Sequence, residues 1–232
     1  QRPVWNVGMT VARFIALEGG EGVGKSTQAK LLADELGRRG IAVELTREPG
    51  GTPGAEAIRA LLLNPPGDGW TAEAEALLFA AARDDHVRQT IRPALARGAW
   101  VICDRFADST RIYQGTLGNV DPRVIRGLER ISVGPTRPDL TIVLDLPAEL
   151  GLKRAAARRG HEKADRFETE TLDFHRKLRD AFRELAEREP ERCVLIDASG
   201  DVDTVANAVW AAVNERLEPG RAPAATIEDL VP

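Results

Sequence analysis

The sequence predicts an α/β protein with a doubly wound, five-stranded parallel sheet and helices on both faces. Two observations lead to this fold class. Five short apolar runs alternate with longer helical patterns along the 232 residues. The first apolar run passes directly into a glycine-rich turn and then a helix start, as in a β-turn-α unit. In such sheets ligands bind beyond the carboxyl ends of the strands, so we look for function there.

The predicted strands share a continuous apolar run, which is typical of strands that are buried on both faces of a parallel sheet. In chain order they cover residues 14–18, 41–45, 100–104, 140–145 and 193–197. Because the sequence shows no internal repeat and the strands and helices alternate to near the end, we expect one domain over residues 9–217. Residues 1–8 precede the only methionine, Met9, and are expected to be a leader or remnant, and residues 218–232 a mobile tail.

The predicted helices show apolar side chains on one face and residues suited to their ends. Gly40 suits the left-handed cap of the first helix, and Pro53 suits the first turn of the second. Pro93 must bend or restart the third. In chain order the predicted helices cover residues 25–39, 53–63, 72–97, 121–132, 147–159, 171–188 and 202–217, and residues 64–70 form a loop.

The composition excludes several classes of protein. A formal net charge of −4 provides no basic field for nucleic acid or membrane. No apolar run approaches the roughly 20 residues needed to span a bilayer, and the start lacks the form of a signal peptide. Cys103 and Cys193 each lie in an apolar run, where a thiol packs as a small hydrophobe. We therefore expect a soluble protein of the reducing cytoplasm.

The glycine-rich turn matches the phosphate-loop pattern G-x-x-x-x-G-K-[ST] from Gly19 to Ser26. Glycines let successive backbone N–H groups point into one concavity, and the following helix adds its free donors and positive dipole end. Lys25 is expected to reach the outer phosphates and Ser26 to bind a Mg²⁺ that bridges them. The residues predicted to bind ATP here are Gly19, Gly20, Glu21, Gly22, Val23, Gly24, Lys25, Ser26 and Thr27. The fold class is thus a P-loop NTPase type.

A phosphate loop alone leaves switch GTPases, motor ATPases and small-molecule kinases open. A switch GTPase should carry Asn-Lys-x-Asp after a strand, and the sequence has none; Asp197 to Gly200 fit D-x-x-G, but only after the fifth strand. A kinase needs arginines from several elements to neutralise donor and acceptor phosphates. Such arginines are present at 47, 59, 83, 105, 154, 158, 159 and 166. The residues alone therefore favour a P-loop kinase of a small phosphorylated or hydroxylated substrate.

Four segments, in order, resemble the bacterial thymidylate kinase family: residues 14–28, 46–52, 77–83 and 104–115. The resemblance extends from about residue 13 to 214. It implies an ATP:dTMP phosphotransferase that makes dTDP and ADP by direct in-line transfer with Mg²⁺, and a homodimer formed by helix packing. Another nucleotide or deoxynucleoside kinase, or a nucleotide-switched binding protein, stays open as an alternative.

The resemblance also implies a dTMP site. Phe79 matches the ring on which thymine stacks, Arg83 the residue that bonds the base, and Tyr113 the tyrosine that excludes a ribose 2′-hydroxyl. Arg105 matches the arginine that holds the acceptor phosphate, and Asp104 the carboxylate that organises Mg²⁺ or assists at that phosphate. The full dTMP set is Glu21, Glu48, Arg59, Phe79, Arg83, Arg105, Thr110, Tyr113 and Gln114.

The arginine-rich segment 157–167 matches the family's lid. Gly22 stands where some relatives carry an arginine, so lid arginines must meet the transition-state charge, with Arg158 and Arg159 as first choices. Arg166 is expected to stack on adenine. This lid is slightly longer than in the family, with residues 161–163 in the excess. The expected catalytic residues are Lys25, Asp104, Arg105, Arg158 and Arg159, with Ser26 and Asp104 at the metal.

Overall fold

The computed structural model describes residues 11–160 and 166–219. Its centre is a five-stranded, entirely parallel sheet with strand order β2-β3-β1-β4-β5. The strands are β1 (Phe14–Glu18), β2 (Val43–Arg47), β3 (Trp100–Asp104), β4 (Leu140–Asp145) and β5 (Cys193–Asp197). This confirms the predicted fold class. The first strand lies at the centre of the sheet, so the turn that follows it opens at the middle of the carboxyl edge.

The second strand begins two residues later than predicted. Ile41 was expected to start it, but its N–H donates to the Leu36 carbonyl in the turn that ends the first helix, and its side chain is buried in the core. The strand then pairs with β3 up to Arg47, which lies in register with Asp104. The shift therefore places Arg47 and Asp104 side by side at the carboxyl edge.

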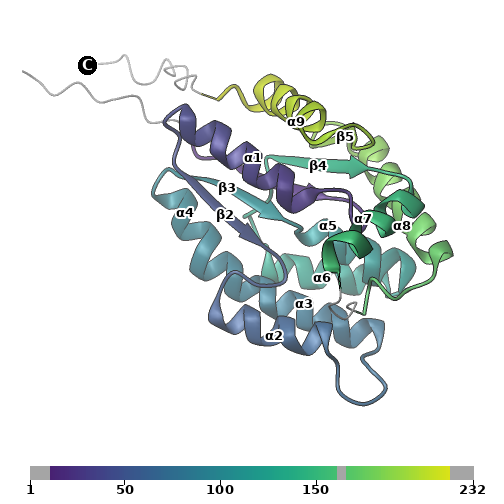
Figure 1. Ribbon diagram of the computed structural model, residues 1–232. Helices are drawn as coiled ribbons and strands as arrows, with labels where there is room; N and C mark the ends of the chain where they lie inside the picture. Colours follow the sequence, from purple (N-terminus) through teal and green to yellow (C-terminus); the bar gives the residue numbers. More distant parts are fainter. Residues whose placement is uncertain (1–10, 161–165, 220–232) are drawn as a thin grey trace, which may run out of the picture.

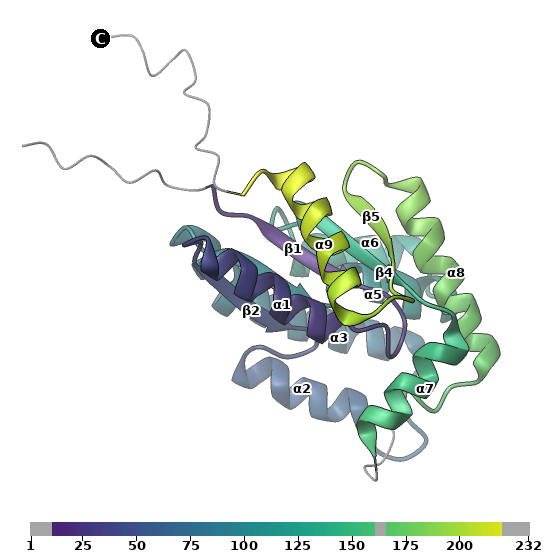
Figure 2. The same ribbon diagram turned by 45° about the horizontal axis from the view of Figure 1, so that its top comes forward.

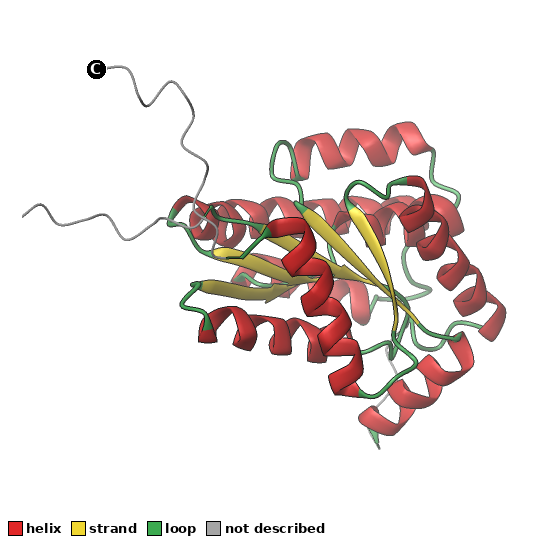
Figure 3. Cartoon of the chain, turned by 90° about the horizontal axis from the view of Figure 1, so that it is seen from above, coloured by secondary structure: helices red, strands yellow, loops and turns green. Residues whose placement is uncertain are grey.

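The helices cover both faces of the sheet, as Figures 1 and 2 show. On one face, α1 (Lys25–Arg38) and α9 (Val202–Leu217) pack on the odd-numbered side chains of β1, such as Ile15 and Leu17. On the other face, Phe14 and Ala16 pack against the helices that come before and after β3. The sheet thus lies between two helical layers (Figure 3).

Most predicted helices are present with ends that differ by a residue or two. The remaining helices are α2 (Pro53–Leu63), α3 (Ala72–His86), α4 (Arg92–Ala96), α5 (Ala107–Thr110), α6 (Pro122–Ser132), α7 (Ala148–Arg159) and α8 (Leu172–Arg188). Gly40 has the expected positive φ, and Thr52, with Pro53 after it, caps α2 by accepting from the N–H of Ala55. Capping residues such as Gly40 and Pro53 therefore marked helix ends correctly in the sequence.

Two π-helical segments depart from the predicted pattern. The helix expected over residues 72–97 is interrupted by η1 (Val87–Ile91) and restarts one residue before Pro93, as that proline requires. Two elements that follow β3, α5 and η2 (Arg111–Leu117), were not predicted from the sequence. Wide π-helical turns are often found at functional sites, and η2 carries Tyr113 and Gln114.

Both cysteines are buried and free, in keeping with the role expected of them. Among the described residues, no helix has both the length and the apolar character needed to cross a membrane. The leader over residues 1–8, lid residues 161–165 and most of the tail lie outside the described part of the chain.

Candidate active site

The phosphate loop joins the buried end of β1 to the first turn of α1. Gly19, Gly22 and Gly24 have φ values of +132°, +67° and +98°, which side chains other than glycine rarely adopt. At Gly19 a Cβ would also lie 2.5 Å from the carbonyl oxygen of Leu144. The pattern's glycines are therefore required by the backbone, and the loop presents its amides beside the N-terminus of α1.

Gly22 and Gly151 bring the backbone of α7 directly against the phosphate loop. A Cβ on Gly22 would lie 1.9 Å from the carbonyl oxygen of Gly151, and one on Gly151 would lie 2.3 Å from that of Glu21. No side chain fits at position 22 while α7 holds this place. This close approach gives a physical reason for the glycine at position 22.

Lys25 folds back over the loop. Its Nζ donates to the carbonyl oxygens of Gly19 (3.2 Å) and Gly20 (2.6 Å). Burial lowers the pKa of Lys25 and the charge of Arg105 lowers it further, to about 8, although nearby carboxylates act against this. An incoming polyphosphate would stabilise the charged amine.

Ser26 and Asp104 meet at the carboxyl edge. The Ser26 hydroxyl donates to Asp104 Oδ2 over 2.5 Å. Their oxygens suit Mg²⁺, which prefers oxygen ligands and is commonly held by one or two protein groups together with substrate phosphates. Among the described residues no cluster of three His, Cys, Asp or Glu side chains could hold a metal by itself. The pair therefore fits a cation that arrives with a nucleotide.

Arg105 links the phosphate loop to the segment after β3. Its Nη2 donates to Glu21 Oε1 over 2.6 Å, and its Nη1 donates to the Gly19 carbonyl over 3.1 Å. The Tyr113 hydroxyl donates to the same Glu21 oxygen over 3.1 Å. Burial raises the pKa of Glu21, but Arg105, Lys25 and Tyr113 lower it by more, to about 2. Glu21 is thus a charged anchor for both side chains.

Glu18, the last residue of β1, is a site residue that the sequence analysis did not identify. Its carboxylate is fully buried and accepts from the backbone N–H of Phe106 (2.8 Å) and from the Ser109 hydroxyl (2.6 Å). Burial and the charge of Asp108 raise its pKa to about 7. Glu18 fixes the turn in which Arg105 adopts a φ of +69°. An acidic residue at the end of a buried strand was the only available signal.

A second wall of the site comes from α3. Arg83 is buried; its Nε donates to Glu48 Oε2 over 2.7 Å, and its Nη2 donates to Thr110 Oγ1 over 3.0 Å. His86, also missed by the sequence analysis, holds the other oxygen of Glu48 through Nδ1 at 3.0 Å. Glu48 therefore orients Arg83, and both of its oxygens already have partners on α3.

Most of these residues line one cavity of about 210 Å³, which Glu18 and His86 support from behind. The predicted site residues that line it are Glu21, Gly22, Gly24, Lys25, Ser26, Glu48, Arg59, Phe79, Arg83, Asp104, Arg105, Thr110, Tyr113, Gln114 and Arg158. Gly19, Gly20, Val23, Thr27, Arg159 and Arg166 are the predicted residues outside that lining. Val23 packs its side chain in the core, so only its backbone is available to a phosphate.

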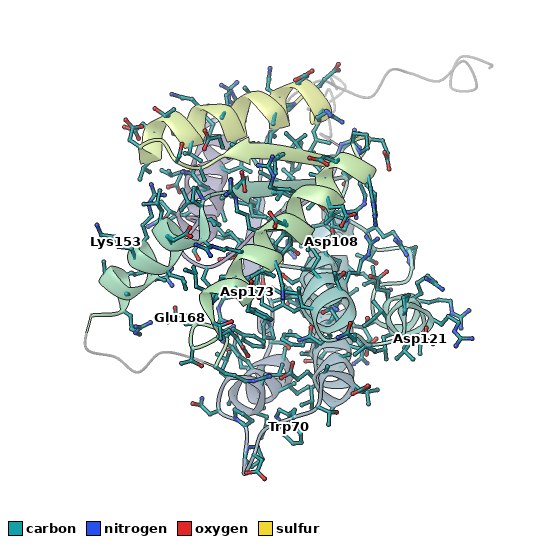
Figure 4. The ribbon with its side chains drawn as sticks, turned by 90° about the vertical axis from the view of Figure 1, so that its right-hand side faces the viewer. Trp70, Asp108, Asp121, Lys153, Glu168 and Asp173 are labelled. Carbon is teal, nitrogen blue, oxygen red and sulfur yellow. The ribbon has the colours of Figure 1, made fainter. Side chains whose placement is uncertain are left out.

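Arg158 and Arg159, at the end of α7, both lie against Glu168. Arg159 forms an ion pair with one Glu168 oxygen, and Arg158 Nη2 lies 3.7 Å from the other. Glu168 lies inward from α7, whereas Lys153 is on its outer side (Figure 4). Of the two predicted arginines, Arg158 lines the cavity and Arg159 does not.

Arg166 lies against two side chains, those of Glu75 and Phe167. Its guanidinium forms an ion pair with Glu75 and lies 5.2 Å from the ring centroid of Phe167. Phe167 in turn lies 6.3 Å from Phe79 and 5.5 Å from Tyr113, between ring centroids. This places Arg166 beside α3 and outside the lining of the cavity, and its stacking on adenine stays a prediction.

Comparison with known proteins agrees with the geometry. The family model described as thymidylate kinase matches residues 17–209. The chain is 59% identical over 205 residues to a thymidylate kinase of Bradyrhizobium sp. (strain ORS 278), covering 88% of this chain and 91% of that relative. The chain belongs to the thymidylate kinase family. A thymidylate kinase of Bradyrhizobium diazoefficiens is 60% identical over 89% of this chain and 91% of its own length.

A solved structure shows the same architecture. The crystal structure of thymidylate kinase from Ehrlichia chaffeensis aligns with a TM-score of 0.69 at 31% sequence identity, covering 87% of this chain and 98% of that chain. Membership of the thymidylate kinase family makes the chain a nucleotide-binding kinase, a transferase of nucleotide biosynthesis. The predicted resemblance is confirmed, and the alternatives of a switch GTPase and a nucleotide-switched binding protein do not agree with it.

Proposed function

We propose that the protein transfers the γ-phosphoryl group of ATP to dTMP, giving dTDP and ADP, with Mg²⁺ bound to the nucleotide. One observation carries the proposal: a single cavity joins the phosphate loop at one end to Arg105, Tyr113, Phe79 and Arg83 at the other. A donor at the loop and an acceptor on the second wall would place their phosphates opposite each other. This arrangement supports direct in-line transfer without a phosphoenzyme.

The residues of the chain act mainly by positioning and by charge. The loop amides and Lys25 bind the donor phosphates, and Arg105 holds the 5′-phosphate of the acceptor through its planar fork of donors. Ser26 and Asp104 would hold Mg²⁺, which supplies charge neutralisation between the phosphates. Arg158 covers the transferring group. No general base is needed, because a phosphate monoester has a second pKa of about 6 and is largely ionised near neutral pH.

The acceptor wall supports a deoxynucleotide with a flat base. Phe79 offers an apolar ring on which a base can stack. Tyr113 is held by Glu21, so its ring is fixed beside the position proposed for the sugar, where a 2′-hydroxyl would meet it. Arg59, which donates to the Pro49 carbonyl over 2.9 Å, lines the same cavity and is proposed to assist at the acceptor phosphate.

A panel of acceptors with purified protein, ATP and Mg²⁺ tests the proposal. We expect rapid ADP release with dTMP. Release should be slow with ribothymidine 5′-monophosphate, AMP, GMP or a nucleoside that carries no phosphate. Poor turnover of dTMP beside rapid turnover of another acceptor would identify a different nucleotide kinase. ADP release that is the same with and without any acceptor would contradict phosphoryl transfer.

We propose that the protein is a homodimer that pairs through α2, α3 and α6. This surface exposes Leu77 and Ile131, which are 58% and 72% accessible, together with Leu61 and Val124. Large exposed apolar side chains on neighbouring helices are typical of an interface. In sedimentation at micromolar concentration, Ile131→Asp should be monomeric and the parent protein dimeric. Val202→Asp, at an exposed apolar position on α9, is the control and should not change the mass; a monomeric parent protein would contradict the proposal.

A further inference from the structure

Glu75 is a buried carboxylate that has no role in the reaction as proposed above. It lies on α3, and its side chain is 4% accessible. Residues 75, 79 and 83 are spaced by four, so Glu75 shares one helix face with Phe79 and Arg83, the residues proposed to contact the base. Its two oxygens have different partners: Oε2 accepts from Gln114 Nε2 over 2.9 Å, and Oε1 forms an ion pair with Arg166.

The bond from Gln114 to Glu75 fixes which way the Gln114 amide points. An ionised carboxylate only accepts hydrogen bonds, so the amide must turn its NH₂ group toward Glu75 and its oxygen away. Among the described residues no group donates to that oxygen, and Gln114 lines the cavity. The amide therefore offers the cavity a hydrogen-bond acceptor. The guanidinium of Arg166 holds the other oxygen of the same carboxylate.

The same wall offers a donor. Arg83 uses Nε and Nη2 for bonds to Glu48, Phe106 and Thr110, whereas its Nη1 makes no hydrogen bond within the described residues. A donor from Arg83 and an acceptor from Gln114 complement the edge of a pyrimidine that has a carbonyl at C4 and a ring N–H beside it. Cytosine presents the reverse pattern, with an amino group at C4 and a ring acceptor beside it.

We propose that Glu75 is a specificity-determining positioning residue, which acts through Gln114 to make the pocket select thymine or uracil over cytosine. The inference rests on the proposed function, because it concerns the acceptor of that reaction. It explains why a carboxylate is buried at the base end of the cavity, and it gives Arg166 a role as the partner of that carboxylate.

The variant Glu75→Gln tests the inference. An amide at position 75 can donate as well as accept, so Gln114 is free to flip and present either group. We expect the ratio of kcat/KM for dTMP to kcat/KM for dCMP to fall by about 10-fold to 100-fold, while the KM for ATP stays within about twofold. The response to dUMP should follow that to dTMP, because the two share the edge that is being read and differ only in the methyl group.

Glu73→Gln is the matched control. Glu73 lies in the same first turn of α3, carries the same charge and is exposed, so its change should leave the ratio unaltered. Gln114→Met is the second variant and removes the amide without touching Glu75. It should lower the ratio by a similar factor, and adding Glu75→Gln to it should lower the ratio no further.

An unchanged ratio in Glu75→Gln, or an equal loss with dTMP and dCMP, would overturn the inference and leave Glu75 a purely structural residue. If Glu75→Gln does not fold, a parent-like ratio in Gln114→Met would overturn it as well. Failure of the proposed function is distinguishable, since the unmodified protein would then not phosphorylate dTMP at all.

Discussion

Replacing Lys25 with alanine should lower kcat by about 10²-fold to 10³-fold, the effect typical of removing one preorganised group that stabilises transition-state charge. Lys25 Nζ lies over the loop within 3.2 Å of two of its carbonyl oxygens, where the outer phosphates of ATP are proposed to bind. The measurement is the steady-state turnover of saturating dTMP. Thermal unfolding should show no loss of stability, because burial lowers the pKa of this amine and its charged form disfavours the folded state at pH 7.

Lys30→Ala is the control for Lys25→Ala. Lys30 lies on the same helix, is exposed and has no contact with the cavity, so turnover should be unchanged. Near-normal turnover in Lys25→Ala would remove this lysine from the mechanism.

The lowered pKa of Lys25 also predicts that the affinity for ATP depends on pH. In the free protein the pKa is lowered to about 8, so the amine loses its charge as the pH rises through 8, well before an ordinary lysine would. The affinity for ATP, measured as Kd, should therefore weaken above about pH 8. The variant Lys25→Arg keeps its charge across this range and should lose the alkaline limb. An affinity of the unmodified protein that is constant to pH 9.5 would contradict this account.

The sheet could be predicted from the sequence because its central strands are buried on both faces. A strand such as β3 reads as an unbroken apolar run, and its limits were predicted correctly. The edge strand β2 has only partly buried and exposed side chains, so its limits were not marked by hydrophobicity. The η2 segment was missed because a π-helical turn matches neither helical nor strand periodicity.

The candidate site was predictable where the backbone or the strand ends dictate it. Lys25 and Arg105 follow strands at the carboxyl edge, and this placement was clear from the sequence. Glu75 and His86 were not identified, because each acts through a partner far away in the chain: Gln114 for Glu75, and Glu48 for His86. Such pairs leave no local pattern. The ion pair between Arg166 and Glu75 could not be predicted for the same reason, since these two residues lie far apart in the chain.

Replacing Arg105 with lysine should lower kcat/KM for dTMP by about 10²-fold and leave the KM for ATP nearly unchanged. Lysine keeps the positive charge but cannot bind a phosphate through two parallel N–H groups while also holding Glu21. In the structure Arg105 uses Nη2 for Glu21 and Nη1 for the Gly19 carbonyl and Ser109, so the fork also fixes the loop on which Tyr113 depends. The measurement is the dependence of initial rate on dTMP at saturating ATP.

The control for Arg105→Lys is Arg38→Lys, at an exposed position of α1 outside the cavity lining, which should behave as the parent protein. A second comparison separates binding from support. Glu21→Gln removes the anchor and keeps the arginine, so it should weaken dTMP binding by a smaller factor than Arg105→Lys does. If both variants lowered kcat/KM for dTMP equally, Arg105 would act only by holding Glu21 and Tyr113 in place. If Arg105→Lys altered the KM for ATP and not the KM for dTMP, Arg105 would serve the donor nucleotide alone. The acceptor phosphate would then have to bind elsewhere.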